Sequence, residues 1–276
     1  MEVFNCNGKL LDLSHPHVMG IINVTPDSFY AESRAINKAE ALEKTKKMVD
    51  QGIKIIDIGA VSTRPGSEFI SSKEEIARIL PVLSSVRKNF PQIFISIDTF
   101  RSEVAKIAIE EGVDIINDIS AGNLDPEILQ VVSNSGLPYI FMHMKGLPKN
   151  MQDKPIYQNV VHEILTFLFE KKRYFRSFGI NQLIADPGFG FGKSIDDNFH
   201  LLNSLDVFKI LEIPILAGLS RKSMFYKFLG TSPDQSLNAT SFAHTVALLK
   251  GVKLLRVHDA LEAIEIVKLV EKLKSL

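Results

Sequence analysis

The sequence has almost no cysteine and no long apolar run. Cys6 is the only cysteine among 276 residues, so no disulfide can form within the chain and nothing indicates an oxidising compartment. No apolar stretch approaches the length that crosses a bilayer, and the first residues lack the basic and apolar regions of a signal peptide. We therefore expect a cytoplasmic protein with no membrane partner.

An excess of charge of one sign is also missing. Lys plus Arg and Asp plus Glu both number 32, so the formal net charge is zero. A balanced chain offers no broad electrostatic attraction for nucleic acid or for an acidic membrane surface. We expect neither partner, although a local basic site remains compatible with this balance.

A phosphate-binding P-loop is absent, although residues 188–194, GFGFGKS, resemble one at first sight. The P-loop spacing would place its first glycine at position 187, which is Pro187, and the GxGxxG pattern is not met either. Nucleotide hydrolysis is therefore not expected. We interpret Gly190 and Gly192 as turn glycines that let the backbone pass close to a ligand.

Short apolar runs alternate with helical patterns along the whole chain. The runs are rich in β-branched residues and lack polar alternation, as is typical of strands buried on both faces. They occupy residues 18–23, 53–59, 93–98, 113–120, 138–144, 182–188, 213–220 and 252–259. Eight strand–helix units in a chain of this length predict an α/β fold, a (β/α)8 TIM barrel, with residues 1–276 forming a single domain.

An N-terminal β-hairpin precedes the first unit, within residues 1–14. Asn7-Gly8 is a type I′ turn signal between two short apolar segments. We interpret Lys9, beside this turn, and Lys172, in a later helical pattern, as solvated side chains. Helix starts are expected at Asn37 and Ser72, each followed by a glutamate at capping-box spacing.

Polar residues recur where the runs end, and in such barrels the loops after the strands carry the chemistry. They are Asn23, Thr63 with Arg64, Asp98, Asn117 with Asp118, His143, Asp186, Lys222, and Arg256 with His258. We interpret Asp118 as a cap, His143 as a strand-end histidine bonded to backbone, and Arg221 as a structural partner of a carboxylate. Capping alone does not explain polar groups after all eight strands.

The remaining rim residues fall into two chemical sets. Guanidinium groups and other donors suit phosphate oxygens, and this set is Thr63, Arg64, Arg256 and His258. A planar heterocycle with a donor–acceptor edge suits the second set, Asp98, Asn117, Asp186 and Lys222. The rim therefore predicts a ligand that carries both a phosphate group and a nitrogen heterocycle.

Eight segments match the sequence pattern of one known family, in the order in which that family has them. Each segment alone would be a weak signal. They are GIINVTPDSF at 20–29, DIGAVSTRPGSE at 57–68, SIDTFR at 96–101, INDISAG at 116–122, MHMKGLPKNMQ at 142–152, ADPGFGFGKS at 185–194, GLSRKS at 218–223 and RVHD at 256–259. In these segments the chain resembles the dihydropteroate synthases over nearly its whole length. The resemblance implies that (7,8-dihydropterin-6-yl)methyl diphosphate and 4-aminobenzoate give 7,8-dihydropteroate and pyrophosphate.

The resemblance also implies roles for individual residues. Asn23 is the protein ligand of Mg²⁺, and the diphosphate is held by Thr63, Arg64, Arg256 and His258. The pterin is held by Asp98, Asn117, Asp186 and Lys222, and positions near 4-aminobenzoate are Pro65, Phe191 and Ser220. Asp98, Lys222 and Arg256 are the catalytic residues that we expect. A homodimer through outer helices is a further implication.

The expected chemistry is consistent with these residue types. Mg²⁺ prefers oxygen ligands and keeps several waters, so one Asn oxygen plus phosphate oxygens suffices. The metal and the arginines stabilise charge on the leaving group, and Asp98 stabilises positive charge on the pterin methylene. An aromatic amine attacks directly, so no nucleophilic side chain or strong base is required.

Two segments depart from the family pattern. Residues 30–33, YAES, stand where Ser-Asp-Gly-Gly is common, and Ala60-Val61 stand where Gly-Glu is frequent. Both lie in loops expected to close over the site. Two alternatives remain: a corrinoid-linked methyltransferase domain, which needs no STRPG-type loop, and a pterin-binding paralogue without catalysis.

Overall fold

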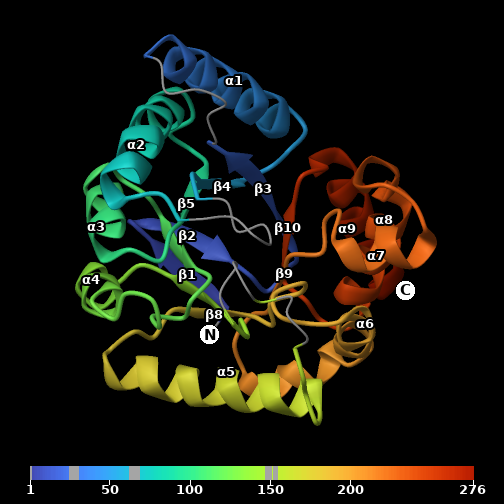
Figure 1. The fold of residues 1–276 in the computed structure, drawn as a ribbon. Coiled ribbons are helices and arrows are strands. Elements are labelled where there is room, and N and C mark those ends of the chain that lie inside the picture. The colour runs from blue at the N-terminus through green and yellow to red at the C-terminus, as the bar shows by residue number, and fades with distance from the viewer. Residues whose placement is uncertain (1, 25–30, 62–68, 147–150, 152–154) are drawn as a thin grey trace.

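Eight parallel strands form one sheet that curls into a barrel (Figure 1). The computed structural model describes residues 2–24, 31–61, 69–146, 151 and 155–276, with the backbone alone for 31–37. The strands are β3 (His17–Asn23), β4 (Ile55–Gly59), β5 (Phe94–Asp98), β6 (Ile115–Asp118), β7 (Tyr139–Met142), β8 (Leu183–Asp186), β9 (Leu216–Ala217) and β10 (Leu254–Val257). A parallel bridge between Ala185 and Ile215 joins β8 to the segment before β9. The predicted TIM barrel is confirmed.

Helices surround the barrel and bury one apolar face each against the strands (Figure 1). They are α1 (Ala31–Asp50), α2 (Ser72–Asn89), α3 (Ser102–Glu110), α4 (Ile128–Ser135), α5 (Val160–Ser177), α6 (Ile195–Asn203), α7 (Ser223–Leu229), α8 (Leu237–Leu249) and α9 (Ala260–Lys274), with 3-10 turns η1 (Leu205–Leu211) and η2 (Pro233–Gln235). No helix in the described part of the chain is long and apolar enough to span a membrane. The cytoplasmic location stays a prediction.

The predicted helix start at Asn37 is wrong, and the predicted cap of α2 is displaced by one residue. Ser71, not Ser72, is the N-cap of α2, and its Oγ accepts a hydrogen bond from the Glu74 amide at 3.2 Å. Two adjacent serines both satisfy the capping pattern, and the extended backbone of Ser71 decides between them. Asn37 lies inside α1, which begins at Ala31.

The N-terminal hairpin closes the amino end of the barrel. β1 (Val3–Cys6) and β2 (Lys9–Asp12) pair antiparallel, and Asn7 and Gly8 have φ of 53° and 83°, which confirms the type I′ turn. Apolar side chains of the hairpin pack on residues near the starts of the strands, in one buried cluster of Phe4, Cys6, Leu11, Leu13, Met19, Ile55, Ile115, Ile140, Ile184, Leu216 and Leu254. This end of the barrel is therefore filled by side chains.

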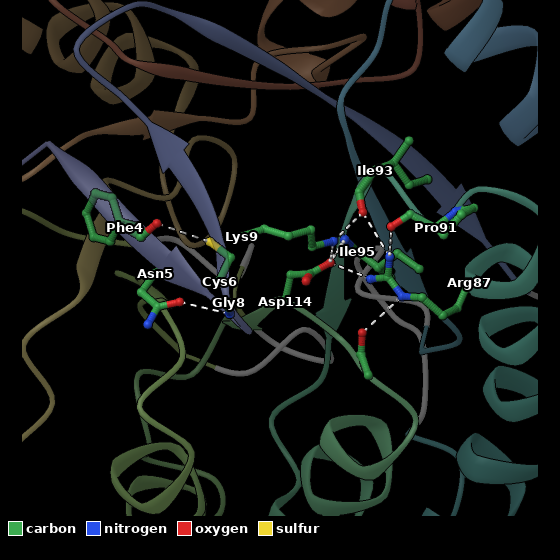
Figure 2. Close-up of polar contacts among 11 residues, drawn as sticks. Phe4, Asn5, Cys6, Gly8, Lys9, Arg87, Pro91, Ile93, Ile95 and Asp114 are labelled. Carbon is green, nitrogen blue, oxygen red and sulfur yellow. Dashed lines mark hydrogen bonds and ion pairs between the residues drawn. The ribbon is translucent and has the colours of Figure 1, made fainter.

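Two lysines interpreted as solvated are bound within the fold. Nζ of Lys9 donates to Oδ2 of Asp114 at 2.8 Å and to the Ile93 carbonyl at 2.7 Å (Figure 2). Lys172 on α5 is buried, and its Nζ donates to the Leu211 carbonyl. The partners of both lysines are distant in sequence, so only the fold reveals these contacts.

Inward-facing positions change in character from one end of the barrel to the other. Side chains alternate between the two faces of a strand, so Asp57 follows Ile55 on the inner face of β4 and Arg256 follows Leu254 on β10. The apolar residues nearest the amino ends belong to the cluster under the hairpin. On four strands the neighbour toward the carboxyl end is polar: these are Asp57, Asn117, Asp186 and Arg256, and they belong to the site described next.

Candidate active site

Strand register places several of the predicted residues at one level of the barrel. Asn23 of β3 pairs with Gly59 of β4, which in turn pairs with Asp98 of β5. Asp98 pairs with Asn117 of β6. A Cβ on Gly59 would stand 3.0 Å from the Cβ of Asp98, so the glycine leaves the space that this carboxylate occupies. The carboxyl-end residues thus share one rim.

Arg256 is the centre of the polar cluster on this rim. Its Nε donates to Oδ2 of Asp57 at 2.6 Å, and its Nη2 donates to Oδ2 of Asp98 at 2.6 Å. Nδ2 of Asn117 donates to the same Oδ2 of Asp57 at 3.1 Å. Oδ1 of the buried Asp57 has no hydrogen-bond partner among the described residues. One guanidinium therefore joins two carboxylates, and the cluster retains an acceptor for a further donor.

Carboxylates outnumber cations in this cluster. Burial raises the pKa of Asp98 to about 7, Arg256 acts in the opposite direction, and Asp57 raises it further. For Arg256, burial disfavours the charged form, but Asp57 and Asp98 outweigh that effect and raise its pKa. Arg256 is a permanent cation, whereas Asp98 gains or loses its proton near neutral pH. A ligand that donates hydrogen bonds or carries positive charge would satisfy the excess carboxylate.

Asp186 and Lys222 form a second part of the site. Oδ1 of Asp186 accepts a hydrogen bond from the Gly188 amide at 2.7 Å. Burial raises the pKa of Asp186, while the Gly188 amide and Lys222 oppose this rise. Burial also lowers the pKa of Lys222 to about 8, against the attraction of Asp186. Nζ of Lys222 lies 4.5 Å from the ring centre of Phe191, so an aromatic face adjoins this charged pair.

Ser220 and His258 meet near the ends of β9 and β10. Oγ of Ser220 accepts a hydrogen bond from the His258 amide at 3.2 Å and lies 3.2 Å from Nδ1 of the same residue. Partial burial lowers the pKa of His258 to about 4, and the cations Arg256 and Lys44 lower it as well. Near pH 7 the imidazole is therefore neutral, and it offers a hydrogen bond rather than a charge.

Three predicted site residues lie outside the described residues: Thr63, Arg64 and Pro65. Residue 30 of the first altered segment lies outside them as well, and residues 31–33 form the start of α1. In the second altered segment Ala60 is buried, and Val61 packs against Phe100, Ile119 and Met142. The effect of both departures on loop closure stays a prediction.

Structural interpretations at the rim have different outcomes. Asp118 does cap its own loop, because its carboxylate accepts from the amides of Ser120 and Gly122, each at 2.7 Å. Arg221 forms a two-pronged ion pair with Asp259, with distances of 2.9 and 2.8 Å. The interpretation of Arg221 is confirmed, whereas Asp118, interpreted as a cap of the following helix, is structural but caps its own loop, because α4 begins only at Ile128.

The interpretation of His143 is wrong. Its Nδ1 lies 3.1 Å from Nζ of Lys193, so its ring contacts a buried side chain rather than backbone. The interpretation of Gly192 as a glycine that lies close to a ligand also changes. Gly192 lies close to the backbone of the protein itself, because a Cβ there would stand 2.1 Å from the Lys145 carbonyl oxygen.

Asp57 is the residue of this cluster that the sequence reasoning missed. It lies in the middle of an apolar strand run, where its burial is complete. A carboxylate within a strand buried on both faces is itself a signal, because such a group needs a charged or hydrogen-bonding partner. Its position two residues before the carboxyl end of β4 directs it toward Arg256.

Asn23 is the residue that could hold a metal ion. It ends β3 and is exposed, and its side-chain oxygen is a hard donor of the kind that Mg²⁺ prefers. Within the described ranges, no group of three or more His, Cys, Asp or Glu could hold a metal. An ion at Asn23 would therefore take its other ligands from water and from a bound substrate, which suits Mg²⁺.

A surface groove of about 530 Å³ lies at the opposite end of the barrel, between the hairpin and α9. Its histidines are bound to neighbouring protein groups: Nε2 of His17 lies 2.7 Å from the Asp12 carbonyl, and Nδ1 of His15 lies 3.3 Å from Glu271. Polar groups that satisfy one another leave little to recognise a ligand. The chemistry therefore belongs to the carboxyl-end rim.

Comparison with known proteins shows the family to which the chain is similar. The sequence model of the family described as "Pterin binding enzyme" matches residues 19–258. The dihydropteroate synthase of Haemophilus influenzae is 42% identical over 264 residues, covering 95% of this chain and 95% of that protein.

Two solved structures of the dihydropteroate synthase of Xanthomonas albilineans are similar in fold. The one with 4-aminobenzoic acid has a TM-score of 0.92 and 36% identity, covering 100% of this chain and 99% of that one. The one in complex with 7,8-dihydropteroate has a TM-score of 0.88 and 34% identity, covering 99% of each. With Asp98, Asn117, Asp186, Lys222 and Arg256 around one barrel end, this chain belongs to the pterin-binding enzymes and, among them, to the dihydropteroate synthases of folate biosynthesis.

Proposed function

We propose that the carboxyl-end rim condenses (7,8-dihydropterin-6-yl)methyl diphosphate with 4-aminobenzoate, giving 7,8-dihydropteroate and pyrophosphate. The relatives solved with 4-aminobenzoic acid and with 7,8-dihydropteroate support these substrates. The observation that carries the assignment to this rim is Arg256 held between the buried carboxylates Asp57 and Asp98. Buried carboxylates in excess over cations suit a planar heterocycle with N–H donors.

The pterin ring is the group that this excess would bind. Asp186 accepts from paired N–H donors at one edge of the ring, and Lys222 donates to a ring acceptor. Nδ2 of Asn117 is bound to Asp57, so the amide offers its oxygen to the pterin. Each hydrogen bond to a charged group contributes about 1.5–3 kcal/mol.

Asp98 and Arg256 act on the bond that breaks. As the C–O bond to the diphosphate weakens, positive charge grows on the methylene carbon and spreads into the ring. Ionised Asp98 stabilises that charge, and Arg256 keeps Asp98 ionised by lowering its pKa. Two nitrogens of Arg256 are bound to carboxylates, which leaves Nη1 for the diphosphate.

Asn23, Thr63, Arg64 and His258 hold the leaving diphosphate. Asn23 would hold Mg²⁺, which when bound offsets negative charge on the diphosphate. Neutral His258 donates one hydrogen bond, and a bound anion would raise the pKa of its imidazole.

The aryl substrate lies beside Phe191. The Phe191 ring adjoins Lys222. The ammonium of Lys222 attracts both the aryl face and the carboxylate of 4-aminobenzoate. Ser220 lies on the His258 side of the rim. Pro65 is the third residue assigned to 4-aminobenzoate. The amine of 4-aminobenzoate attacks the methylene carbon and releases its proton to water.

The protein forms a homodimer through α7 and α8. Phe228, Leu229 and Phe242 on these helices are 67%, 55% and 63% exposed, although they are large and apolar. Phe228 also contacts Phe199 of α6, with ring centres 5.3 Å apart, so the apolar surface extends over a third helix. Exposed apolar patches of this kind mark interfaces. Phe228→Glu should give monomers in sedimentation, whereas Phe169→Glu on α5 should leave the dimer intact.

A turnover assay with both purified substrates tests the function. We expect 7,8-dihydropteroate and pyrophosphate in equal amounts, loss of turnover on treatment with a chelator, and recovery with Mg²⁺. Asn23→Ala should raise the Mg²⁺ concentration required for half-maximal rate. Methyl transfer from a methylated folate to a corrinoid would support the alternative methyltransferase, and pterin binding without product would support the non-catalytic paralogue.

A further inference from the structure

The loop between β8 and α6 contains a fully enclosed lysine that the proposed mechanism does not use. Lys193 is 3% exposed. Its Nζ donates to the Gly188 carbonyl at 2.7 Å and to the Phe191 carbonyl at 3.1 Å, and it lies 3.1 Å from Nδ1 of His143. These are the three nearest partners for the three protons of one ammonium, and the His143 carbonyl lies farther away, at 3.5 Å. The lysine thus joins two points of its own loop to the end of β7.

Close backbone packing supports the same arrangement. A Cβ on Gly188 would stand 2.0 Å from the His143 carbonyl oxygen, so the loop lies directly against the segment after β7. The hydroxyl of Tyr157 donates to the Gly192 carbonyl at 2.8 Å, which fixes the far side of the loop. The loop is therefore held on both sides, and Lys193 is the charged group between these contacts.

Both loop carbonyls bound by Lys193 adjoin groups of the substrate site. The Gly188 amide donates to Asp186, the carboxylate assigned to the pterin edge. Phe191 places its ring beside Nζ of Lys222, where the aryl substrate is assigned. Displacement of either carbonyl would therefore move a group that faces substrate.

We propose that Lys193 is a positioning residue, whose ammonium, held against His143, fixes the loop that presents the Phe191 ring to the aryl substrate and holds Asp186, through the Gly188 amide, in place for the pterin. The proposal rests on the proposed function only for the identity of those substrates. Lys193 itself touches neither of them and takes no part in the bond changes.

The charge state of this lysine is sensitive to pH near neutrality. Burial lowers the pKa of Lys193 to about 7. Burial also lowers the pKa of His143 to about 3, so its Nδ1 is available as an acceptor. The charged or titratable groups that face Lys193 are His143 after β7, Lys145 in the next loop, Asp186 of β8, Asp197 of α6 and Lys222 before α7. Above pH 7 the ammonium loses a proton, and one of its three contacts is lost.

The test compares Lys193→Met with Lys172→Met. Lys172 is also a buried lysine that donates to a carbonyl, but it lies on α5, and its acceptor is Leu211. We expect Lys193→Met to raise KM for 4-aminobenzoate about tenfold, the effect of losing one charge-assisted hydrogen bond, with a smaller change in kcat. Lys172→Met should leave both constants within about twofold of wild type.

Thermal unfolding and the pH profile separate positioning from a purely structural role. Lys193→Met leaves the Gly188 and Phe191 carbonyls without their donor, so its Tm should fall, and Lys172→Met, which leaves the Leu211 carbonyl without its donor, measures what such a loss does to Tm away from the site. KM of the wild type for 4-aminobenzoate should rise between pH 7 and pH 9, and this rise should be reduced in Lys193→Met but retained in Lys172→Met. Lys222 is intact in both variants, so its own titration does not cause the difference.

Each outcome decides the question. An unchanged KM in folded Lys193→Met, or the same pH profile as the wild type, overturns the positioning role. If Lys193→Met does not fold, Lys193→Arg, which keeps its charge up to pH 9, replaces it: a KM that rises between pH 7 and pH 9 in wild type but less in Lys193→Arg supports the positioning role, and equal profiles overturn it. A wild-type protein without product would contradict the proposed function, and direct binding of 4-aminobenzoate by calorimetry would then test Lys193 with the same two variants.

Discussion

The two ends of the barrel contain the same kinds of charged group in opposite proportions. At the amino end, two cations bind one carboxylate: Asp114 accepts from Lys9 at 2.8 Å and from Arg87 (Figure 2). The Ile95 amide donates to the same carboxylate oxygen at 2.8 Å. Both cations also donate to the Ile93 carbonyl. This end therefore has two cations for one carboxylate, all of them on Oδ2, while Oδ1 of the buried Asp114 has no hydrogen-bond partner among the described residues.

At the carboxyl end, two carboxylates bind one cation. Arg256 joins Asp57 and Asp98, and an oxygen of Asp57 has no partner among the described residues. In the described part of the chain, the cluster at each end leaves one buried carboxylate oxygen without a partner, so the difference lies in the ratio of carboxylates to cations. Two carboxylates for one cation favour a ligand that donates hydrogen bonds or carries positive charge, which points to the carboxyl end as the binding end.

Removal of the bridging cation should have the largest effect. Arg256→Met leaves two buried carboxylates without their cation, a change that costs about 3–5 kcal/mol and lowers kcat/KM about a thousandfold. Arg256 also lies between carboxylates assigned to the pterin, so affinity for a phosphate-free pterin should fall together with affinity for pyrophosphate. Calorimetry with both ligands checks this, and loss of pyrophosphate affinity alone would make Arg256 a phosphate ligand only. Arg87→Met, at the amino end, should leave both affinities unchanged.

The corresponding change at the amino end should affect stability and not catalysis. Asp114→Ala removes the shared partner of Lys9 and Arg87, and we expect a loss of about 3 kcal/mol in the free energy of unfolding. The estimate is at the low end for buried pairs because the side chains of Lys9 and Arg87 are 30% and 22% exposed. Denaturant unfolding measures the loss, while kcat/KM of the folded protein should stay within about twofold.

An exposed pair provides the control for that experiment. Asp50 pairs with Lys46 one turn earlier on α1, at 2.8 Å, with both side chains more than half exposed. Asp50→Ala should cost less than about 0.5 kcal/mol. Equal losses in Asp50→Ala and Asp114→Ala would mean that the ion pairs of Asp114 with Lys9 and Arg87 add no more to stability than an exposed pair.

A smaller effect is expected from the pterin carboxylate. Asp186→Asn keeps the shape of the side chain but presents a donor where an acceptor is required. We expect pterin diphosphate binding to weaken by about 1.5–3 kcal/mol, with the fold intact. Unchanged affinity by calorimetry would remove Asp186 from the site.

Sequence reasoning was most successful where local chemistry decides the structure. The strand runs, the Asn7-Gly8 turn and the cap formed by Asp118 all depend on neighbours in sequence or on a simple period. The N-cap at Ser71 was missed by one residue because Ser72 satisfies the same local pattern. Positions of elements were therefore predictable, and their boundaries less so.

Long-range pairing is what the sequence could not supply. The partner of Arg256 on β4, Asp57, is 199 positions away in the sequence. Arg256 was assigned to the diphosphate, but in the structure it also binds two carboxylates on the pterin side of the site. Lys193 and His143 are 50 positions apart and appear in the sequence as a turn residue and a strand end. Such contacts follow from barrel register, so only the assembled fold reveals them.

The smallest predicted effect concerns pH and again separates the two ends. Asp98 must be ionised to stabilise positive charge on the pterin, and its pKa in the folded protein is about 7. Lowering the pH from 7 to 6 should therefore reduce kcat/KM for pterin diphosphate up to about tenfold, and Asp98→Asn should abolish this acid limb while lowering the plateau. A wild-type profile that is flat between pH 6 and pH 7 would show that Asp98 ionisation does not limit the reaction.

Ionisation of Asp98 is expected to favour catalysis but to lower the stability of the fold, so unfolding provides a second test of its role. The pKa of Asp98 in the folded state exceeds its ordinary value of 3.8, so between that value and about pH 7 the folded protein retains a proton that the unfolded chain has lost. The contribution of Asp98 to stability is therefore full below about pH 4 and falls as pH rises through 7. Denaturant unfolding across this range should show a decline in wild type that is reduced in Asp98→Asn, and Asp50→Ala should retain it. Suppose that kcat/KM rises and the free energy of unfolding falls as pH increases, and that both trends depend on Asp98. The carboxylate at the carboxyl end of the barrel then favours the reaction and destabilises the fold. A decline that persists fully in Asp98→Asn would assign the stability cost to other groups.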